Sequence, residues 1–480
     1  MKASITFNPF GLVAGLFLGL GTVACRPLNI SIPAPNPNTN TGPSIAATPN
    51  NRDIVRSNIV RSLPGQLDDV PMFNSNSPEW VKTEGILLST FPPESKQVPD
   101  AHLNFPFQGE FTLFAHHFSH TPPDLQTLYL GILIRNPGQQ TAVISVFEAA
   151  SYLMEPEAPF KEQEPMLDNP NGDIYSGPGI RAVDNVLRGR RLDDFPEKIS
   201  IPPGESRMLM NLPIPVRDLE KPINGRSSFF HLASSGQIHV ASLAMYAKKN
   251  DNGTDRAPTI TEWQELLNKG GLAGSRDRTP TPPNQTSGSL VYGRVSGVQS
   301  GSRWQANLME EGADRLDIPS IDRPISYTID TLRGGRLGTQ QIQSASMLVR
   351  YPDTAYESHG NYGVRYDLTL PLFNNTDKSQ KVAITLESPL KEDQLSQGGL
   401  RFRQPPLDFP FFRGTVRLSV MKEKEQTAIR YVHLWHRQGQ IIEPLETVEL
   451  APQEKRSIRL EFIYPPDSVP PQVLTIETVK

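Results

Sequence analysis

Cysteine is almost absent from this sequence, because Cys25 is the only one among 480 residues. A single thiol excludes an intramolecular disulfide, and it excludes iron–sulfur clusters and cysteine-based zinc sites, which need several thiolates. A basic excess is also absent, since 47 Lys and Arg stand against 51 Asp and Glu. Proteins that bind nucleic acid usually carry such an excess, so we expect no nucleic-acid partner.

Sequence signatures of catalysis are missing as well. The chain contains no Gly-x-Ser-x-Gly, no Walker motif and no Gly-x-Gly-x-x-Gly ahead of a helix. Five of the nine histidines form two groups that are close in sequence, His116/His117/His120 and His433/His436. On straight strands neither group converges at metal-binding distance, so we expect no metal and no cofactor. A bend after His120 leaves a metal site open as the alternative.

The N-terminus carries an apolar run, Phe10–Val23, that follows a basic start at Lys2. It is shorter than the about 20 residues that cross a bilayer, and it is typical of a secretory signal. We therefore expect residues 1–24 to be a signal peptide.

Cys25 ends the segment Thr22-Val-Ala-Cys25, which resembles a lipobox, the motif in which the cysteine is lipidated. Thr22 replaces the usual Leu, so ordinary cleavage after Ala24 stays open, as does a short N-terminal core helix. We predict lipidation of Cys25 and membrane contact through the lipid. The predicted location is the cell envelope, as a periplasmic or outer-membrane lipoprotein, with secretion as the second choice.

The rest of the chain divides by composition. Residues 25–61 are rich in Pro and Asn and predict a tether. We expect a first β domain over residues 62–270, a linker over 271–288 that is rich in Gly, Pro and Thr, and a second β domain over 289–480. The 46 prolines disfavour long helices. One helix is expected just before the linker, because Thr259 and Glu262 have capping-box spacing and Gly270 would end it.

Two blocks of strand pattern recur in the same order. Leu128–Ile134, Asn136 and Thr141–Phe147 predict a hairpin, and Tyr366–Leu372, Asn374 and Val382–Leu386 repeat the pattern. Downstream, Lys198–Glu205 and Glu449–Glu454 each place a Pro- and Glu-containing turn between strands. The repeat predicts an internal duplication of two β-sandwich domains. Their general form resembles immunoglobulin-like modules.

Several short motifs resemble an uncharacterised family of exported cyanobacterial proteins, a domain of unknown function. They are Leu63–Asp68, Asn74–Pro78, Glu84–Ser89, Phe114–His117, Asp353–Tyr362 and Phe412–Val416. The resemblance covers most of the chain from Ser62 onward. It implies export and a folded body, and it implies no activity.

The best candidate site is the segment Tyr351–Tyr362, which gathers carboxylates, a histidine and tyrosines before a strand. Loops on a rigid β scaffold often hold binding groups. The candidate binding residues are Asp353, Tyr356, Glu357, His359 and Tyr362. The leading hypothesis is a non-enzymatic envelope protein, a binding or structural module whose partner is an envelope polysaccharide or protein. The alternative is a carbohydrate-active enzyme or glycan-binding protein that uses this loop.

Overall fold

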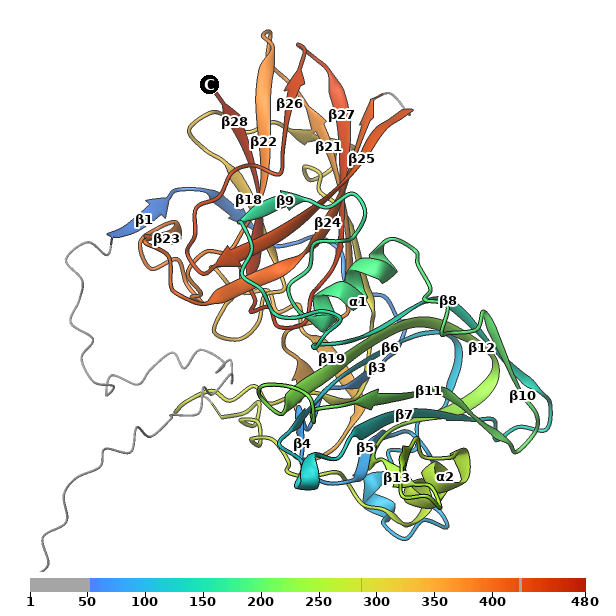
Figure 1. The fold of residues 1–480 in the computed structure, drawn as a ribbon. Helices are drawn as coiled ribbons and strands as arrows, with labels where there is room; N and C mark the ends of the chain where they lie inside the picture. Colours follow the sequence, from blue (N-terminus) through green and yellow to red (C-terminus); the bar gives the residue numbers. More distant parts are fainter. Residues whose placement is uncertain (1–51, 286, 423–424) are drawn as a thin grey trace, which may run out of the picture. The chain divides into compact units, whose positions relative to one another are not determined.

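The computed structural model describes residues 52–285, 287–422 and 425–480. These residues are mainly β-strands (Figure 1), so the predicted mainly β fold class is confirmed. The described ranges also contain two α-helices, α1 (Pro178–Leu187) and α2 (Ile260–Lys269). Neither is long and apolar enough to cross a membrane. The predicted signal peptide, Cys25 and most of the tether lie outside the described residues.

The largest sheet has twelve strands and is drawn mostly from the first half of the chain. Its strands are β3 (Met72–Ser75), β4 (Trp80–Val81), β5 (Gly85–Ser89), β6 (Phe107–His120), β7 (Leu128–Arg135), β8 (Ala142–Leu153), β10 (Lys198–Ile201), β11 (Ser206–Ile214), β12 (Ile223–Tyr246), β15 (Ser296–Gln299), β19 (Ala345–Arg350) and β20 (Glu357–Ser358).

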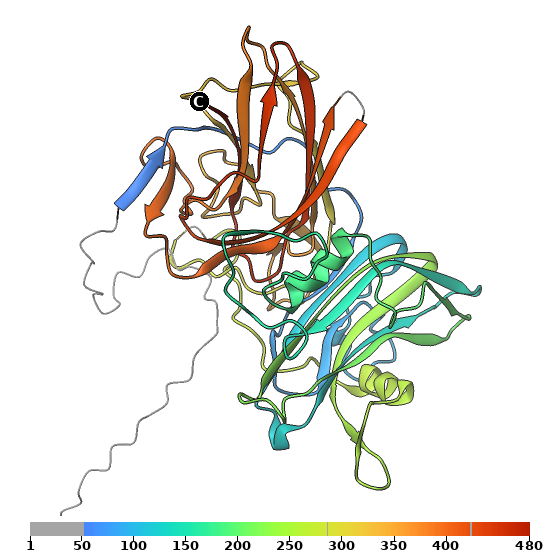
Figure 2. The same cartoon turned by 45° about the horizontal axis from the view of Figure 1, so that its top comes forward.

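Strand β12 joins two parts of this sheet. Its first part pairs with β6 and β8, and after an irregularity between Ser234 and Ile238 its second part pairs with β7 and β5 (Figures 1 and 2). Long strands that bend in this way make the corners of sandwiches. Side chains from both parts, such as Phe230, Val240 and Ile132, share one hydrophobic core.

Two further sheets come mostly from the second half of the chain. One contains β9 (Met166–Asp168), β16 (Arg303–Asn307), β17 (Leu316–Asp317), β21 (Arg365–Phe373), β24 (Pro410–Lys422), β25 (Glu425–Arg437) and β27 (Lys455–Ile463). The other contains β2 (Ile59–Arg61), β18 (Ile325–Ile329), β22 (Gln380–Glu387), β26 (Glu446–Leu450) and β28 (Gln472–Val479). Leu368, Ile384 and Leu474 belong to one core that both sheets share.

Strands cross between the two halves of the chain. Strand β9 pairs with β25, β2 pairs with β18, and β15 pairs with β3. In the same way β1 (Arg52–Arg56) pairs with β23 (Leu400–Gln404). A second small sheet joins β13 (Lys248–Lys249) and β14 (Asp255–Arg256). The described body is thus interlocked, and the predicted domain boundaries at residues 270 and 289 stay a prediction.

The predicted hairpins are wrong in their pairing, although their strands form. Strand β7 pairs with β11 and β12, while β8 pairs with β10 and β12. In the second block, β21 pairs with β27, while β22 pairs with β26 and β28. The physical reason lies at Asn136 and Asn374. Each side-chain amide donates to a backbone carbonyl of a different strand, Ile201 and Leu450 respectively, so the chain arches across instead of folding back on itself.

Helix α2 forms as the sequence predicts. The Thr259 backbone N–H donates to Glu262 Oε2 (2.7 Å), the Glu262 N–H donates to Thr259 Oγ1 (3.3 Å), and Gly270 caps the end. Trp263 is fully buried against the β7–β12 surface, where Gly131 leaves room for the indole ring. A Cβ on Gly131 would lie 2.9 Å from that ring. Strand β7 is mostly apolar because one face meets the core and the other meets α2.

Candidate functional site

Tyr351 anchors the predicted binding loop deep in the first-half strands. Its side chain is completely buried, its hydroxyl donates to the Ala101 carbonyl (2.8 Å), and the Ser89 backbone N–H donates to its oxygen (3.0 Å). Burial raises the pKa of the Tyr351 phenol, so it stays neutral. The loop therefore begins from a fixed point inside the protein.

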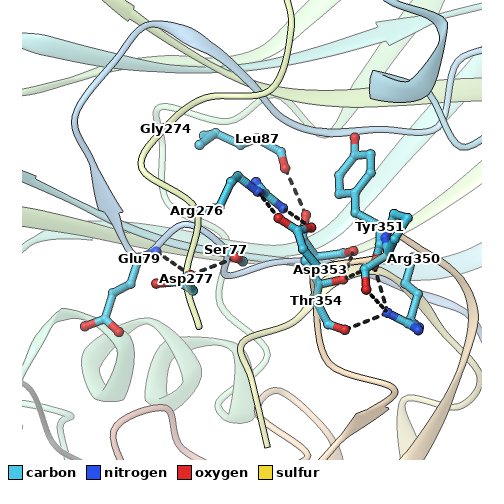
Figure 3. Close-up of polar contacts among 12 residues, drawn as sticks. Ser77, Glu79, Leu87, Gly274, Arg276, Asp277, Arg350, Tyr351, Asp353 and Thr354 are labelled. Atoms are coloured by element: carbon cyan, nitrogen blue, oxygen red, sulfur yellow. Dashed lines mark hydrogen bonds and ion pairs between the residues drawn. The ribbon is translucent and has the colours of Figure 1, made fainter. Parts of the chain in front are cut away.

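Asp353 forms an ion pair with Arg276 of the predicted linker. The guanidinium Nε and Nη2 donate to the two carboxylate oxygens at 2.7 and 3.0 Å (Figure 3). This bidentate contact is the main reason why the pKa of Asp353 is lowered. The same guanidinium lies 5.5 Å from the centre of the Tyr351 ring. Asp353 is thus an ionised partner that ties the loop to the linker.

The linker is itself held by hydrogen bonds in its first part. Asp277 Oδ2 accepts from Ser77 Oγ (2.7 Å) and from the Glu79 backbone N–H (3.3 Å), as Figure 3 shows. Burial raises the pKa of Asp277. The Lys82 N–H donates to the Gly274 carbonyl at 2.7 Å. Within the predicted linker, residues 274–277 are thus bound to the segment 77–82.

The other four predicted binding residues have separate surroundings. Burial raises the pKa of Glu357 and lowers that of His359 to about 4, with Lys391 adding to the second shift. His359 lies 4.9 Å from the Tyr292 ring centre. The Tyr362 hydroxyl donates to the Ser468 carbonyl (2.6 Å), and Tyr356 lies under the Arg350 guanidinium, 3.8 Å from the ring centre. In the part of the chain that the structure describes, no hydrogen bond or ion pair joins any two of the five predicted residues.

A substitution at Tyr351 tests this structural role. Tyr351→Phe should lower the free energy of unfolding by about 1–3 kcal/mol, because the buried Ala101 carbonyl and Ser89 N–H lose their partner. Urea unfolding measures the effect. Tyr356→Phe is the matched control, since its hydroxyl has no hydrogen-bond partner among the described residues and should change stability by less than about 0.5 kcal/mol. Equal effects of the two variants would contradict the anchoring role.

The histidines of the two sequence groups, which were considered as possible metal ligands, are mostly buried. His117 bonds to Ser75 Oγ (2.9 Å) and to the Pro78 carbonyl (2.8 Å), and His116 Nδ1 bonds to Ser227 Oγ (2.6 Å). His433 and His436 are buried, and neither ring nitrogen of either has a partner among the described residues. In the described ranges, no group of three or more His, Cys, Asp or Glu side chains is placed to hold a metal ion.

Sequence reasoning missed a crevice where the two halves of the body meet. Its volume is about 30 Å³, and strands β6, β12, β16 and β21 and the end of α1 line it. The lining residues are Asp68, Glu110, Thr112, Val186, Phe229, His231, Ser302, Arg303, Gly363, Arg365 and Ile463. The charged members are far apart in sequence and share no motif, so only the fold brings them together.

Two arginines lie side by side in this crevice. Arg303 of β16 and Arg365 of β21 are direct neighbours in a parallel strand pair, so their side chains leave the same face. Arg365 Nη2 donates to the Val186 carbonyl at the end of α1 (3.2 Å). Burial, followed by the charge of Arg303, lowers the pKa of Arg365. Among the described residues, no side chain or carbonyl accepts from the Arg303 guanidinium.

His231 lies on the opposite wall between two carboxylates. Its Nδ1 is 2.6 Å from Glu148 Oε2 and its Nε2 is 2.7 Å from Glu110 Oε1. Burial alone would lower the pKa of His231, but the bonds to Glu148 and Glu110 outweigh it and raise the pKa. Ionised carboxylates only accept hydrogen bonds, so both ring nitrogens must donate and His231 is an imidazolium.

Comparison with protein-family models matches residues 58–478 to DUF3370, described as a protein of unknown function. The chain belongs to this family. The sequence-based prediction of a family of unknown function is therefore confirmed. A comparison with curated proteins gave no match. The region that matches DUF3370 contains the loop, the crevice and both Asn-centred arches, so these features belong to the DUF3370 body. Cys25 precedes the match.

Proposed function

We propose that this DUF3370 protein is an exported, lipid-anchored protein of the cell envelope, whose body acts as a binding or structural module. The observation that carries the proposal is the place of Cys25, between the apolar run Phe10–Val23 and a segment rich in Pro and Asn. A lipid chain at Cys25 and the tether would hold the β body at a membrane surface while leaving it free to meet partners. The proposed location is the periplasm or the outer membrane, with secretion as the second choice.

Lipidation predicts that Cys25→Ala moves the protein from the membrane fraction to the soluble fraction. Ala24 still offers a small residue for ordinary signal cleavage, so export should continue. Fractionation with metabolic labelling by radioactive palmitate measures both properties. Ser44→Ala, a similar change in the tether, is the control and should stay labelled and membrane-bound. Unchanged fractionation of Cys25→Ala, or mature protein that retains Met1 in the cytosol, would contradict the proposal.

We further propose that the body arose by internal duplication of an immunoglobulin-like sandwich. Its support is the matching geometry of the two arches. The Asn136 N–H donates to the Glu205 carbonyl and the Asn374 N–H to the Glu454 carbonyl, both at 3.0 Å. The register also agrees. Ile201 pairs with Ala142 as Leu450 pairs with Gln380, and Ser206 pairs with Arg135 as Lys455 pairs with Phe373.

The geometry of the loop favours a structural role over glycan chemistry. Stacking on sugars needs an open aromatic face, whereas Tyr351 is enclosed and Tyr356 is covered by Arg350. Acid–base catalysis needs two carboxyl groups that share one substrate. Both carboxylate oxygens of Asp353 instead accept hydrogen bonds from Arg276. The proposed role of the body therefore remains a non-enzymatic module.

A further inference from the structure

The pairing of Arg303 with Arg365 is a feature that folding alone does not favour. Like charges that lie opposite one another in a sheet destabilise it. Another like-charged pair of neighbours in this sheet, Asp367 and Glu461, shares a counter-ion, because Arg459 binds Asp367 through two bonds of 2.7 Å and lies 3.1 Å from Glu461. In the crevice, however, no described group accepts from the Arg303 guanidinium. The guanidinium N–H groups of Arg303 therefore line the crevice together with those of Arg365.

We propose that the crevice binds the oxyanion group of a small molecule, held between the Arg303 and Arg365 guanidiniums. Guanidiniums match carboxylate, phosphate and sulfate oxygens in geometry and charge, and a bound anion would remove the repulsion between the two arginines. The inference rests on the proposed role of the body as a binding module, and it names the class of ligand.

The surroundings hold both arginines in position. Asp68 Oδ1 accepts from the backbone N–H groups of Ser302 (2.8 Å) and Arg303 (3.2 Å), which fixes the start of β16. The Val186 carbonyl orients Arg365 from one side. The backbone of Arg303 and the side chain of Arg365 are therefore fixed, and the Arg303 side chain is the part that an anion would order. The crevice itself has a volume of about 30 Å³, room for one small group, so a terminal oxyanion would enter it while the rest of the ligand lies outside.

The opposite wall adds a means of selection. His231 is bonded to both Glu148 and Glu110, so this wall offers carboxylate oxygen and no free positive charge, and Glu110 places its 48 % exposed side chain at the crevice. The second oxygen of such a carboxylate repels another anion but accepts hydrogen bonds from hydroxyl groups. The crevice therefore fits a ligand with one anionic end and a hydroxylated remainder better than a dianion with charge at both ends.

Titration calorimetry on the full purified chain tests the site. The probes are inorganic phosphate, sulfate and glucuronate, with glucose as the neutral comparison and sodium chloride at matched ionic strength. Anion binding should be weakened about tenfold or more in Arg303→Gln, because one charge-assisted contact is lost. Arg207→Gln, which removes an exposed strand arginine paired with Glu205, should bind like the parent protein. If glucuronate binds more tightly than phosphate and sulfate, the ligand is an acidic sugar. The reverse order of affinities would identify a free inorganic anion as the ligand.

Thermal unfolding separates a ligand site from a structural arginine. Without anion, Arg303→Gln should melt at the same temperature as the parent or higher, since it relieves the repulsion from Arg365. Phosphate should raise the melting temperature of the parent above that in chloride, and should not do so in Arg303→Gln. A large fall in the melting temperature of Arg303→Gln, or equal effects of phosphate and chloride on the parent, would overturn the proposal. If the crevice does not bind anions, the result of the Cys25 fractionation experiment is unaffected. The anion site and the lipid anchor can therefore be rejected independently.

Discussion

Lowering the pH from 7 to 5 is expected to destabilise the folded protein by several kcal/mol. Burial lowers the pKa of His102 and His433 to about 4, and that of His117 and His436 to about 3. An unfolded chain protonates these rings near pH 6.5. Between pH 6.5 and about 4, the unfolded chain therefore binds protons that the folded chain does not. The free energy of unfolding falls as the pH falls, by about 1.4 kcal/mol per pH unit for each histidine.

Buried carboxyl groups act in the opposite direction over part of this range. Burial raises the pKa of Asp330 well above its usual value, so the folded chain holds a proton there that the unfolded chain has released. Acidification favours the folded state at that group. Smaller rises in pKa act in the same direction at Asp277, Glu357, Glu387 and His231. With His359, whose pKa is also lowered to about 4, five histidines outweigh these groups, so the net slope keeps the sign of the histidines. Urea unfolding at pH 7, 6 and 5 measures it, and a flat profile would contradict the expectation.

His436→Leu isolates the contribution of a single histidine. Neither ring nitrogen of His436 has a partner among the described residues, so Leu removes the titrating group without breaking a hydrogen bond. The slope of unfolding free energy against pH should become shallower by about 1.4 kcal/mol per pH unit. His120→Leu is the control because His120 is exposed and should leave the slope as it is. An unchanged slope in His436→Leu would show that this ring is already protonated in the fold.

Local signals in the sequence predicted the local structure well. The capping box at Thr259 gave helix α2, and the alternating Leu130, Ile132 and Ile134 gave a strand whose side chains are all buried. Helix α1 was missed because it begins at Gly177-Pro178-Gly179, a sequence typical of a turn. Gly177 there has a φ of 111°, which glycine adopts easily, and Pro178 occupies the first turn of the helix.

Long-range partners were beyond the reach of sequence reasoning. Asp353 and Glu357 were joined as one site because they are close in the chain, but Asp353 bonds to Arg276 and Glu357 has no such bond among the described residues. Arg303 and Arg365 become neighbours only when β16 adds to β21. Charged residues that are close in sequence need not be neighbours in the fold, because the pairing of distant strands decides which charged side chains meet in a sheet.

Replacing Asn136 or Asn374 by Ala should each cost about 3–5 kcal/mol of unfolding free energy. Asn136 Nδ2 donates to the carbonyls of Gln140 (2.6 Å) and Ile201 (2.8 Å), and its Oδ1 accepts from the Gly138 N–H (2.8 Å). Asn374 Nδ2 donates to the carbonyls of Lys378 and Leu450, and its Oδ1 accepts from the Thr376 N–H. Both side chains are buried, so Ala would leave these backbone groups unsatisfied, at about 1–3 kcal/mol for each.

The two variants together test the equivalence of the arches. Asn171→Ala, at an exposed position, is the control and should change stability by less than about 0.5 kcal/mol. Asn→Asp at each arch keeps the Oδ1 acceptor and loses both amide donors, so its cost should also be large. If both arches descend from one ancestral unit, the Ala costs should agree within about 1 kcal/mol, with Asn374 the larger because Thr376 Oγ1 also donates to it. If Ala lowers the unfolding free energy at one arch only, the similar hydrogen bonds contribute unequally to stability. That result would remove the energetic support for a duplicated sandwich.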